Sequence, residues 1–434
     1  MKCALRGLTA VTRRRSLVPL LTSPRGHSMP LALYLLALAV FAMGTSEFML
    51  AGLLPAIASD LHVTVGAAGA LTSAFAIGMA VGAPLMAALA RNRSGRTVLL
   101  AFVLLFSAAH AVGATTTSFP VLCATRLVAA LANAGFLAVA VTTAGTLAGP
   151  DRKGRALAVL LSGTTVATVA GVPGGSVLGT LLGWRATFWA VAVLCLPAAA
   201  GLLKTLPAGS ARADTEEGRP RLRWELAQLR RPRLVLVLLL GALVNAATFA
   251  SFTFLAPVVT GAAGLGELWV PLVLVLFGAG SFVGVTVAGR LADRRPGRVV
   301  AVGGPALAVG WPVLAVSAAE PAALLVLVFL LGALSFALGG TLITRALYEG
   351  SRAPTMSGAY ATAALNVGAT AGPLIAATAL GTPAGDLGPL WASGLLVVAA
   401  LLVAYPFRTV IATATEATEP TEPTEATEAT GEGR

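Results

Sequence analysis

The sequence predicts an all-α integral membrane protein with twelve transmembrane helices arranged as two pseudo-symmetric six-helix halves. Three observations predict this class: an apolar composition, twelve long apolar runs, and basic residues concentrated in every second loop. Of the 434 residues, 57% are hydrophobic and only 11% are charged, and the mean hydropathy is +0.86. An average soluble domain carries about 25% charged residues. The chain is therefore too apolar for an ordinary soluble protein.

The twelve apolar runs are each long enough to cross the hydrocarbon core of a bilayer, which takes about 20 helical residues. Lipid offers the backbone no hydrogen-bond partners, and the runs lack the alternation of barrel strands, so we expect helices. In chain order the runs cover residues 31–55, 66–90, 97–116, 119–147, 155–182, 185–204, 233–259, 268–290, 299–317, 321–347, 355–381 and 387–407.

Basic residues follow the even-numbered runs and are almost absent from the alternate loops. Arg91 and Arg93 follow the second run, Arg152 follows the fourth and Arg408 follows the twelfth, with Arg185 as the exception. Loops enriched in Lys and Arg stay in the cytoplasm, so both termini are predicted to be cytoplasmic in a cell inner membrane. The net charge of +12 thus reflects topology and not nucleic-acid binding, because no aromatic residues interleave the basic clusters.

A polar segment at residues 206–232 divides the chain into halves at 29–205 and 233–408, and is predicted to be a cytoplasmic linker. The halves look like copies, because AGVPGG in the fifth run is echoed by AGPLIA in the eleventh. Internal repeats of this kind recur in secondary transporters, whose substrate site lies between the repeats near the bilayer midplane.

The two ends are expected to lie outside the folded unit. Residues 1–28 form a basic extension that is either disordered or an over-extended start before Met29, because it lacks the cleavage site of a signal peptide. Residues 409–434 repeat Thr, Glu and Pro with almost no apolar bulk, a composition typical of disorder.

Several chemistries are excluded by residue spacing. The three cysteines and three histidines show no ligand-like pattern, so we expect no metal and no disulfide. No phosphate-binding loop follows a glycine cluster, so ATP is not the predicted energy source. We expect no cofactor and no enzymatic activity, with a proton gradient as the source of energy.

Glu47 is the only acidic residue well inside a predicted span, and Arg126 lies inside the fourth span. Both lie roughly 10–12 Å below the outer ends of their helices. Charges inside spans are costly and tend to be functional or paired. Burial and a nearby arginine act oppositely on the charge of a carboxyl, so Glu47 can be poised to carry a proton. The alternative is a static partner of Arg126 or a helix-packing hydrogen bond.

Two motifs are interpreted as conformational. GRLADRRPGR contains Gly289, Asp293, Arg294 and Arg298 and follows the eighth run. Its aspartate can approach a helix N-terminus or pair with an arginine, so the loop can lock the cytoplasmic side. The first-half copy lacks this aspartate, which argues against a symmetrical gate. The alternative is an ordinary basic loop.

The second motif, TVAGVPGGSVLG, places four glycines and a proline in the fifth run. Small residues allow close helix packing and proline loosens the helical hydrogen bonding, so the segment is predicted to be bendable. Its central residues are Gly171, Pro173, Gly174 and Gly175. Packing alone is the alternative role.

These motifs resemble those of the major facilitator superfamily: the first its signature loop, the second the antiporter motif of its drug/proton antiporters. From Met29 to about Arg408 the chain is similar to the chloramphenicol-resistance exporters of high-GC bacteria. The similarity lies in MPLALYLLALAVFAMGTSEFMLAGLLP, LANAGFLAVA, LLSGTTVATVAGVPGG, GWRATFWA, FTFLAPVVT and YATAALNVGA.

The resemblance implies a monomeric proton-coupled antiporter that exports a small apolar antibiotic, with chloramphenicol as the expected drug. Export of a sugar or another metabolite is the alternative within transport. A non-transporting sensor or scaffold would need a soluble domain, which neither the linker nor the tail is long enough to form.

Drug and proton are predicted to share one central cavity. Its walls should consist of aromatic residues, which supply apolar contact, and of the few mid-span amides, which can orient a ligand. The predicted wall residues are Phe41, Phe48, Phe136, Asn245, Phe249, Phe252, Tyr360 and Asn366.

Overall fold

The computed structural model describes residues 30–90, 95–148, 153–206, 227–292, 296–350 and 357–407, and this part of the chain contains helices and no strands. Twelve helical segments in it are long and apolar enough to cross a membrane, so the predicted all-α, twelve-span fold is confirmed. The predicted extension at 1–28, most of the linker and the tail at 409–434 lie outside the described residues.

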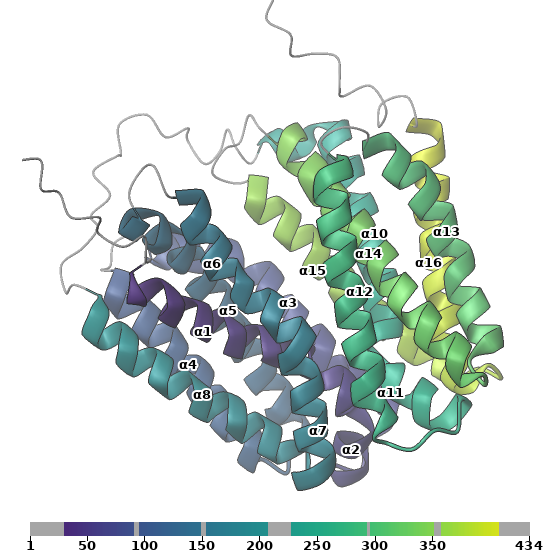
Figure 1. The fold of residues 1–434 in the computed structure, drawn as a ribbon, viewed down its shortest axis with the longest axis horizontal. Coiled ribbons are helices and arrows are strands. Elements are labelled where there is room, and N and C mark those ends of the chain that lie inside the picture. Colours follow the sequence, from purple (N-terminus) through teal and green to yellow (C-terminus); the bar gives the residue numbers. More distant parts are fainter. Residues whose placement is uncertain are drawn as a thin grey trace, which may run out of the picture.

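The first six spans form one bundle (Figure 1). Its elements are α1 (Leu31–Phe48), η1 (Met49–Gly52), α2 (Leu54–Asp60), α3 (Val65–Ala90), α4 (Gly95–Thr115), α5 (Phe119–Ala148), α6 (Lys153–Val166), η3 (Ala167–Gly171), α7 (Val172–Leu182) and α8 (Trp184–Thr205). A core of buried apolar side chains joins α1 to α6 and α8, and it also includes Ala250, Phe254 and Ala376 of the other half.

The last six spans form the second bundle, and its apolar core also includes Ala51 and Val172 of the first bundle. Its elements are η4 (Gln228–Arg230), α10 (Pro232–Thr253), α11 (Leu255–Pro257), η5 (Val258–Ala262), α12 (Trp269–Ala292), α13 (Pro296–Ser317), α14 (Pro321–Glu349), α15 (Ser357–Leu380), η6 (Gly385–Leu387), α16 (Gly388–Ala404) and η7 (Tyr405–Phe407).

Three of the predicted continuous spans are interrupted, the seventh where α10 passes through α11 to the π-helical η5. The first apolar run changes to the 3₁₀ turn η1 after Phe48, and α2 restarts with Pro55 in its first turn, where a missing N–H costs nothing. The fifth run contains the π-helical segment η3 just before Pro173. A proline cannot donate the next hydrogen bond and crowds the carbonyl four residues earlier, which explains a widened turn there.

The two bundles touch along one end of the molecule, where α2, α7 and α11 converge, and diverge towards the other end (Figure 1). Ser73 Oγ on α3 donates to the carbonyl oxygen of Thr370 on α15 at 2.8 Å. Further along α3, Gly78 and Gly82 face α5 of their own bundle instead. The contacts of α3 with α15 include those of Gly66 with Ala377 and of Ser73 with Thr370, both in the first half of α3.

A second contact between the bundles is a backbone-to-backbone approach of α12 to η3. A Cβ atom added to Gly278 would lie only 2.6 Å from the carbonyl oxygen of Thr168, so no other residue fits there without a shift. Small residues permit such close helix packing in membranes.

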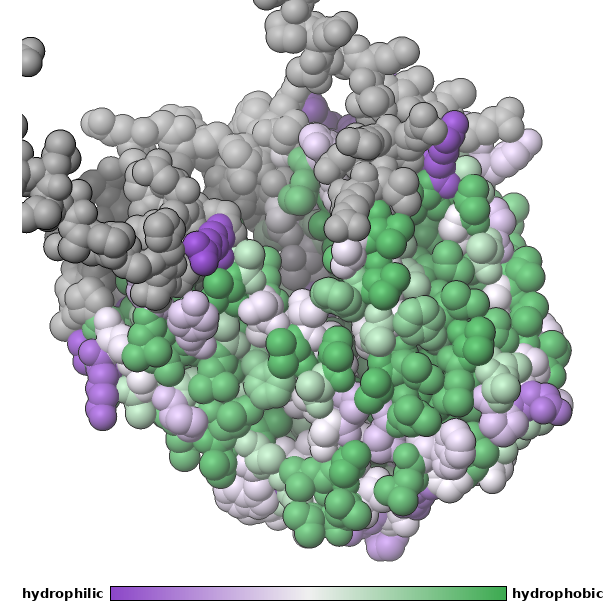
Figure 2. Space-filling view, viewed as in Figure 1, coloured by the Kyte–Doolittle hydropathy of each residue, from purple (hydrophilic) through white to green (hydrophobic). Residues whose placement is uncertain are grey.

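The outer surface of both bundles is widely apolar (Figure 2). Leu181 and Leu182 on the first bundle and Val316 and Leu402 on the second are about 70% exposed. A continuous apolar surface of this extent is the surface that a bilayer covers.

Candidate functional site

Arg126 on α5 is fully buried in the first bundle, and its guanidinium is held by one residue of α1. Nη1 donates to Ser46 Oγ at 2.7 Å, and Nη2 donates to the Ser46 carbonyl oxygen at 2.9 Å. The guanidinium carbon also lies 4.4 Å from the ring centre of Phe75 on α3, a cation–π contact. Three helices thus fix this charge.

His110 on α4 extends the same network. Its Nδ1 lies 2.8 Å from the carbonyl oxygen of Phe106, which can only accept, so Nδ1 carries the hydrogen. Its Nε2 lies 2.6 Å from Ser46 Oγ. Ser46 Oγ already accepts from Arg126, so its own hydrogen is directed at Nε2. Arg126 therefore donates to the Ser46 hydroxyl, and that hydroxyl donates to a neutral His110.

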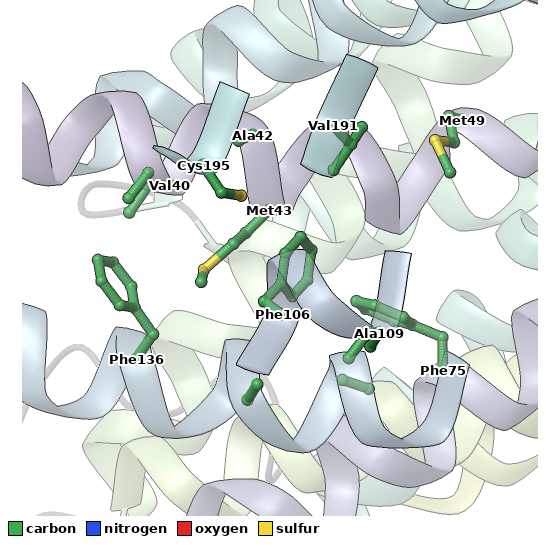
Figure 3. Close-up of a cluster of buried hydrophobic side chains, with 14 of the residues drawn as sticks. Val40, Ala42, Met43, Met49, Phe75, Phe106, Ala109, Phe136, Val191 and Cys195 are labelled. Carbon is green, nitrogen blue, oxygen red and sulfur yellow. The ribbon is translucent and has the colours of Figure 1, made fainter. Parts of the chain in front are cut away.

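The network is enclosed by aromatic rings. The imidazole of His110 lies 4.3 Å from the ring centre of Phe106 and 5.6 Å from that of Phe188. Figure 3 shows Phe75 and Phe106 among the packed apolar side chains of this bundle. Ser46, His110 and Arg126 are all buried by this packing, so each hydrogen bond of the network is costly to lose.

Glu47 is the next residue after Ser46 and is half-buried. Within the described part of the chain, no hydrogen bond or ion pair joins its carboxylate to Arg126, although the two charges interact through space. The sequence placed these groups at similar depth, and the structure puts the guanidinium against the neighbouring residue of α1. Whether Glu47 carries a proton stays a prediction.

A partly open cavity lies between the two bundles; its empty space, including space open to solvent, is about 350 Å³. One wall comes from α1, η3 and α7 of the first bundle, and the rest comes from α10, α12 and α14 of the second. None of the lining residues is charged. They are Phe48, Thr168, Val172, Thr248, Phe249, Phe252, Leu274, Phe277, Gly278, Ser281 and Phe336.

Five phenylalanines form a continuous series of ring contacts in this cavity. The Phe48 ring centre lies 6.0 Å from that of Phe249 and 6.1 Å from that of Phe252. Phe252 lies 4.9 Å from Phe277, which lies 6.2 Å from Phe336. These separations are typical of attractive aromatic pairs, and the rings together offer a surface suited to a planar apolar ligand.

Three of the eight predicted wall residues, Phe48, Phe249 and Phe252, line this cavity. Phe136 does not: it is fully buried in the core of the first bundle, in the same cluster as Val40 and Met43 (Figure 3). Phe41 is half-buried on α1 beside Gly171 of η3.

The remaining three predicted wall residues lie within the second bundle and outside the cavity lining. Asn245 Nδ2 donates to the carbonyl oxygen of Leu365 at 2.7 Å and so ties α10 to α15. Asn366 Nδ2 donates to the carbonyl of Thr362, one turn earlier on its own helix. Tyr360 packs against Leu234 at the start of α10.

Sequence reasoning missed eight lining residues. Phe277 and Phe336 are mid-span aromatic residues, as is Phe249, which was predicted. The sequence alone does not show which face of a helix meets the cavity. Thr168 and Val172 lie inside the glycine-rich motif, in which only the glycines and the proline were predicted to have a role. The others are Thr248, Leu274, Gly278 and Ser281.

The glycine-rich motif contains both crowded and open positions. A Cβ added to Gly171 would collide with Thr45 Oγ1, and one added to Gly175 would lie 3.1 Å from Thr187 Cγ2. The Thr187 hydroxyl donates to the Gly175 carbonyl at 2.8 Å. Gly174 faces open space, and Pro173 lies in the first turn of α7. Close packing is thus most strongly required at Gly171.

The loop motif after the eighth span is only partly described. Asp293 and Arg294 lie outside the described residues, Gly289 lies in α12, and Arg298 lies in the first turn of α13. Its role as a lock stays a prediction.

The sequence profile of the Major Facilitator Superfamily matches residues 36–373. The chain is 75% identical to a protein named Chloramphenicol resistance protein from Streptomyces lividans, over 89% of this chain and 98% of that protein. It is 32% identical to the inner membrane transport protein YdhP of Escherichia coli K12, over 80% of this chain and 89% of that protein.

Two solved structures share the fold at low sequence identity. The nucleoside transporter NupG superposes with a TM-score of 0.69 at 14% identity, over 88% of this chain and 99% of that one. A bacterial homologue of the human lysosomal transporter Spinster, in an inward-facing and unoccupied conformation, gives 0.67 at 17% identity, over 88% and 95%.

Proposed function

The chain belongs to the Major Facilitator Superfamily, and on this premise we propose that it exports chloramphenicol or a chemically similar antibiotic in exchange for protons. It is a multi-pass membrane transporter of a small molecule and not an enzyme. The proposal extends this to the identity of the drug, the coupling ion, the membrane and the orientation of the chain in it.

The residues that line the cavity between the bundles are the main support for this choice of substrate. Its five phenylalanines, two valine or leucine side chains and few hydroxyls suit an uncharged aromatic drug. Its hydroxyls already donate within their own helices: Thr168 to Thr165, Thr248 to Val244 and Ser281 to Gly278. The name of the relative at 75% identity supports the same drug.

Export of a sugar is less well supported by this lining. A sugar presents hydroxyls around its whole ring, and a site for it needs several amide or charged side chains to pair with them. None lines the cavity, and the amides of Asn245 and Asn366 are engaged with backbone carbonyls elsewhere.

Proton coupling is proposed to involve Glu47, with Arg126 as the fixed charge nearby. Glu47 directly precedes Phe48 of the cavity wall, so protonation and drug binding affect neighbouring positions of α1. A carboxyl that alternates between charged and neutral forms can link the two events, because its charge is costly whenever the cavity is dry.

The proposed location is the cytoplasmic membrane, with both termini in the cytoplasm, as the loop charges indicate. In that orientation the joined end of the bundles, at α2, α7 and α11, faces outwards. The structure then corresponds to a state closed to the outside. The cavity is formed by two halves of one chain, which supports a monomer as the working unit.

The test uses the full chain expressed in a drug-sensitive host. We expect resistance to chloramphenicol, and we expect inside-out vesicles to accumulate labelled chloramphenicol when their interior is acidified. A protonophore should abolish the accumulation. Normal protein in the membrane without chloramphenicol resistance or uptake would contradict the proposal, and uptake of sugars alone would favour the alternative.

A further inference from the structure

We propose that Ser46 and His110 form a positioning unit that holds the Arg126 guanidinium off the Glu47 carboxylate and thereby sets the pH range of proton-driven export. The inference rests on the proposed proton coupling and extends it to two residues that no part of that mechanism uses. Neither residue lines the drug cavity.

The first step is the geometry of Arg126. Its two terminal nitrogens are both committed to Ser46, one to the hydroxyl at 2.7 Å and one to the carbonyl at 2.9 Å. Glu47 lies on the next residue of α1, and no hydrogen bond joins it to Arg126 within the described chain. An arginine able to reach a carboxylate normally forms a bidentate pair with it. The two hydrogen bonds to Ser46 hold the guanidinium in its present position.

The second step is the role of His110. The Ser46 hydroxyl can accept from Arg126 in this orientation because its own hydrogen has an acceptor, Nε2 of His110, at 2.6 Å. The imidazole is oriented in turn by the Phe106 carbonyl at 2.8 Å and by two flanking rings. Without that acceptor the buried Ser46 hydroxyl is free to rotate, and its lone pairs no longer point steadily at Nη1.

The third step is the consequence for Glu47. The titratable or charged groups near Arg126 are Glu47 on α1, His110 on α4 and Cys123 on α5. Of these, only Glu47 offers an anionic partner to a released guanidinium at neutral pH. A close pair between them stabilises the charged carboxylate, so a proton binds only at a more acidic pH.

Two substitutions of His110 separate the functions of its two nitrogens. The amide of a glutamine reaches the position of Nε2, so His110→Gln retains an acceptor for Ser46. The shorter asparagine reaches only the position of Nδ1, so His110→Asn retains the donor to Phe106 and loses the acceptor. Ser46→Ala removes the hydroxyl itself. Ser107→Ala is the control, because it removes a buried hydroxyl of α4 that donates to Ala192 and touches none of these groups.

The readout is chloramphenicol uptake by inside-out vesicles as a function of interior pH, at matched protein level. We expect His110→Asn and Ser46→Ala to shift half-maximal uptake by roughly one pH unit towards acid. His110→Gln and Ser107→Ala should keep the wild-type midpoint. If wild type itself shows no proton-driven uptake, the proposed function fails instead.

Unchanged midpoints in both His110→Asn and Ser46→Ala overturn the inference. So does an equal shift in His110→Gln and His110→Asn, because the acceptor would then be irrelevant. Loss of folded protein in both test variants, with Ser107→Ala accumulating normally, assigns the unit to folding and also overturns it.

Discussion

Phe48 on α1 and Phe249 on α10 approach to 6.0 Å between ring centres, although they belong to different bundles. The contact places the residue after Glu47 directly against the aromatic wall of the second bundle. A movement of α1 that changes the environment of Glu47 therefore also changes the shape of the cavity.

Removing a cavity ring should weaken drug binding, which is compared at matched protein level because Phe277 is also buried in the core of the second bundle. We expect Phe277→Ala to lower the apparent affinity for chloramphenicol about two- to tenfold. This range corresponds to the free energy contributed by one aromatic contact. Phe282→Ala is the matched control, because Phe282 lies on the same helix, is 53% exposed and is absent from the lining. Concentration-dependent uptake measures both. Equal effects of the two substitutions would place the drug elsewhere.

Glu47→Gln should abolish drug accumulation driven by a proton gradient and leave downhill drug exchange intact. The amide keeps the size of the side chain and fixes its neutral form, so the cavity can still alternate but cannot couple. If Glu47 is only a structural partner of Arg126, the substitution should instead lower the level of folded protein. Addition of Arg126→Leu should then restore that level. Full gradient-driven uptake by Glu47→Gln would remove this residue from coupling.

The two glycines at the bend of the fifth span should differ in their tolerance of a methyl group. Gly171→Ala brings a Cβ into Thr45 Oγ1 across α1, so we expect a large loss of transport or of folded protein. Gly174→Ala meets nothing within 4 Å and should be nearly neutral. Resistance and protein level are measured together. Equal sensitivity of both positions would mean that flexibility, not packing, is what the motif provides.

Asp60 offers a prediction for pH, because it lies outside the spans. Arg185 donates a hydrogen bond to its carboxylate, Trp184 Nε1 donates at 3.1 Å, and the pKa of Asp60 is lowered chiefly by Arg185. A pKa below the unfolded value of about 3.9 means that the contact stabilises above that pH and that this stabilisation is lost as pH falls through the folded pKa.

We therefore expect Asp60→Asn to lower the melting temperature in detergent at pH 7 and to converge with wild type in strong acid. The pair is partly exposed, so the effect should be below about 1 kcal/mol. Glu267→Gln, at an exposed site, is the control. A difference that persists unchanged to the lowest pH would show that the carboxylate charge is not responsible.

The sequence was sufficient for the parts of the fold that depend on hydrophobicity along the chain. Run lengths predicted the twelve spans, and a mid-span proline marked the segment where η3 interrupts the fifth. It was insufficient wherever the role of a residue depends on which face of its helix the residue occupies. Phe136 and Phe249 are both mid-span aromatics, yet one fills the core of a bundle and the other lines the cavity.

The polar network escaped prediction for the same reason. Glu47 and Arg126 stand out in an apolar sequence because they are charged, whereas Ser46 and His110 carry no such signal. Only the packing of α1 against α4 and α5 shows that Arg126 is bonded to Ser46, 80 positions away in the chain, and that His110 completes the arrangement.

The cavity wall and the polar groups around Arg126 are distributed unequally between the bundles. Eight of the eleven lining residues come from the second bundle, whereas Glu47, Arg126 and His110 all belong to the first. Under antibiotic selection the two properties can therefore evolve separately. Variants that change the range of drugs recognised should accumulate in α10, α12 and α14, and those that uncouple transport from its energy source should fall before the linker. Exchanging second halves between related exporters is accordingly expected to transfer drug preference while the machinery for energy supply stays with the recipient.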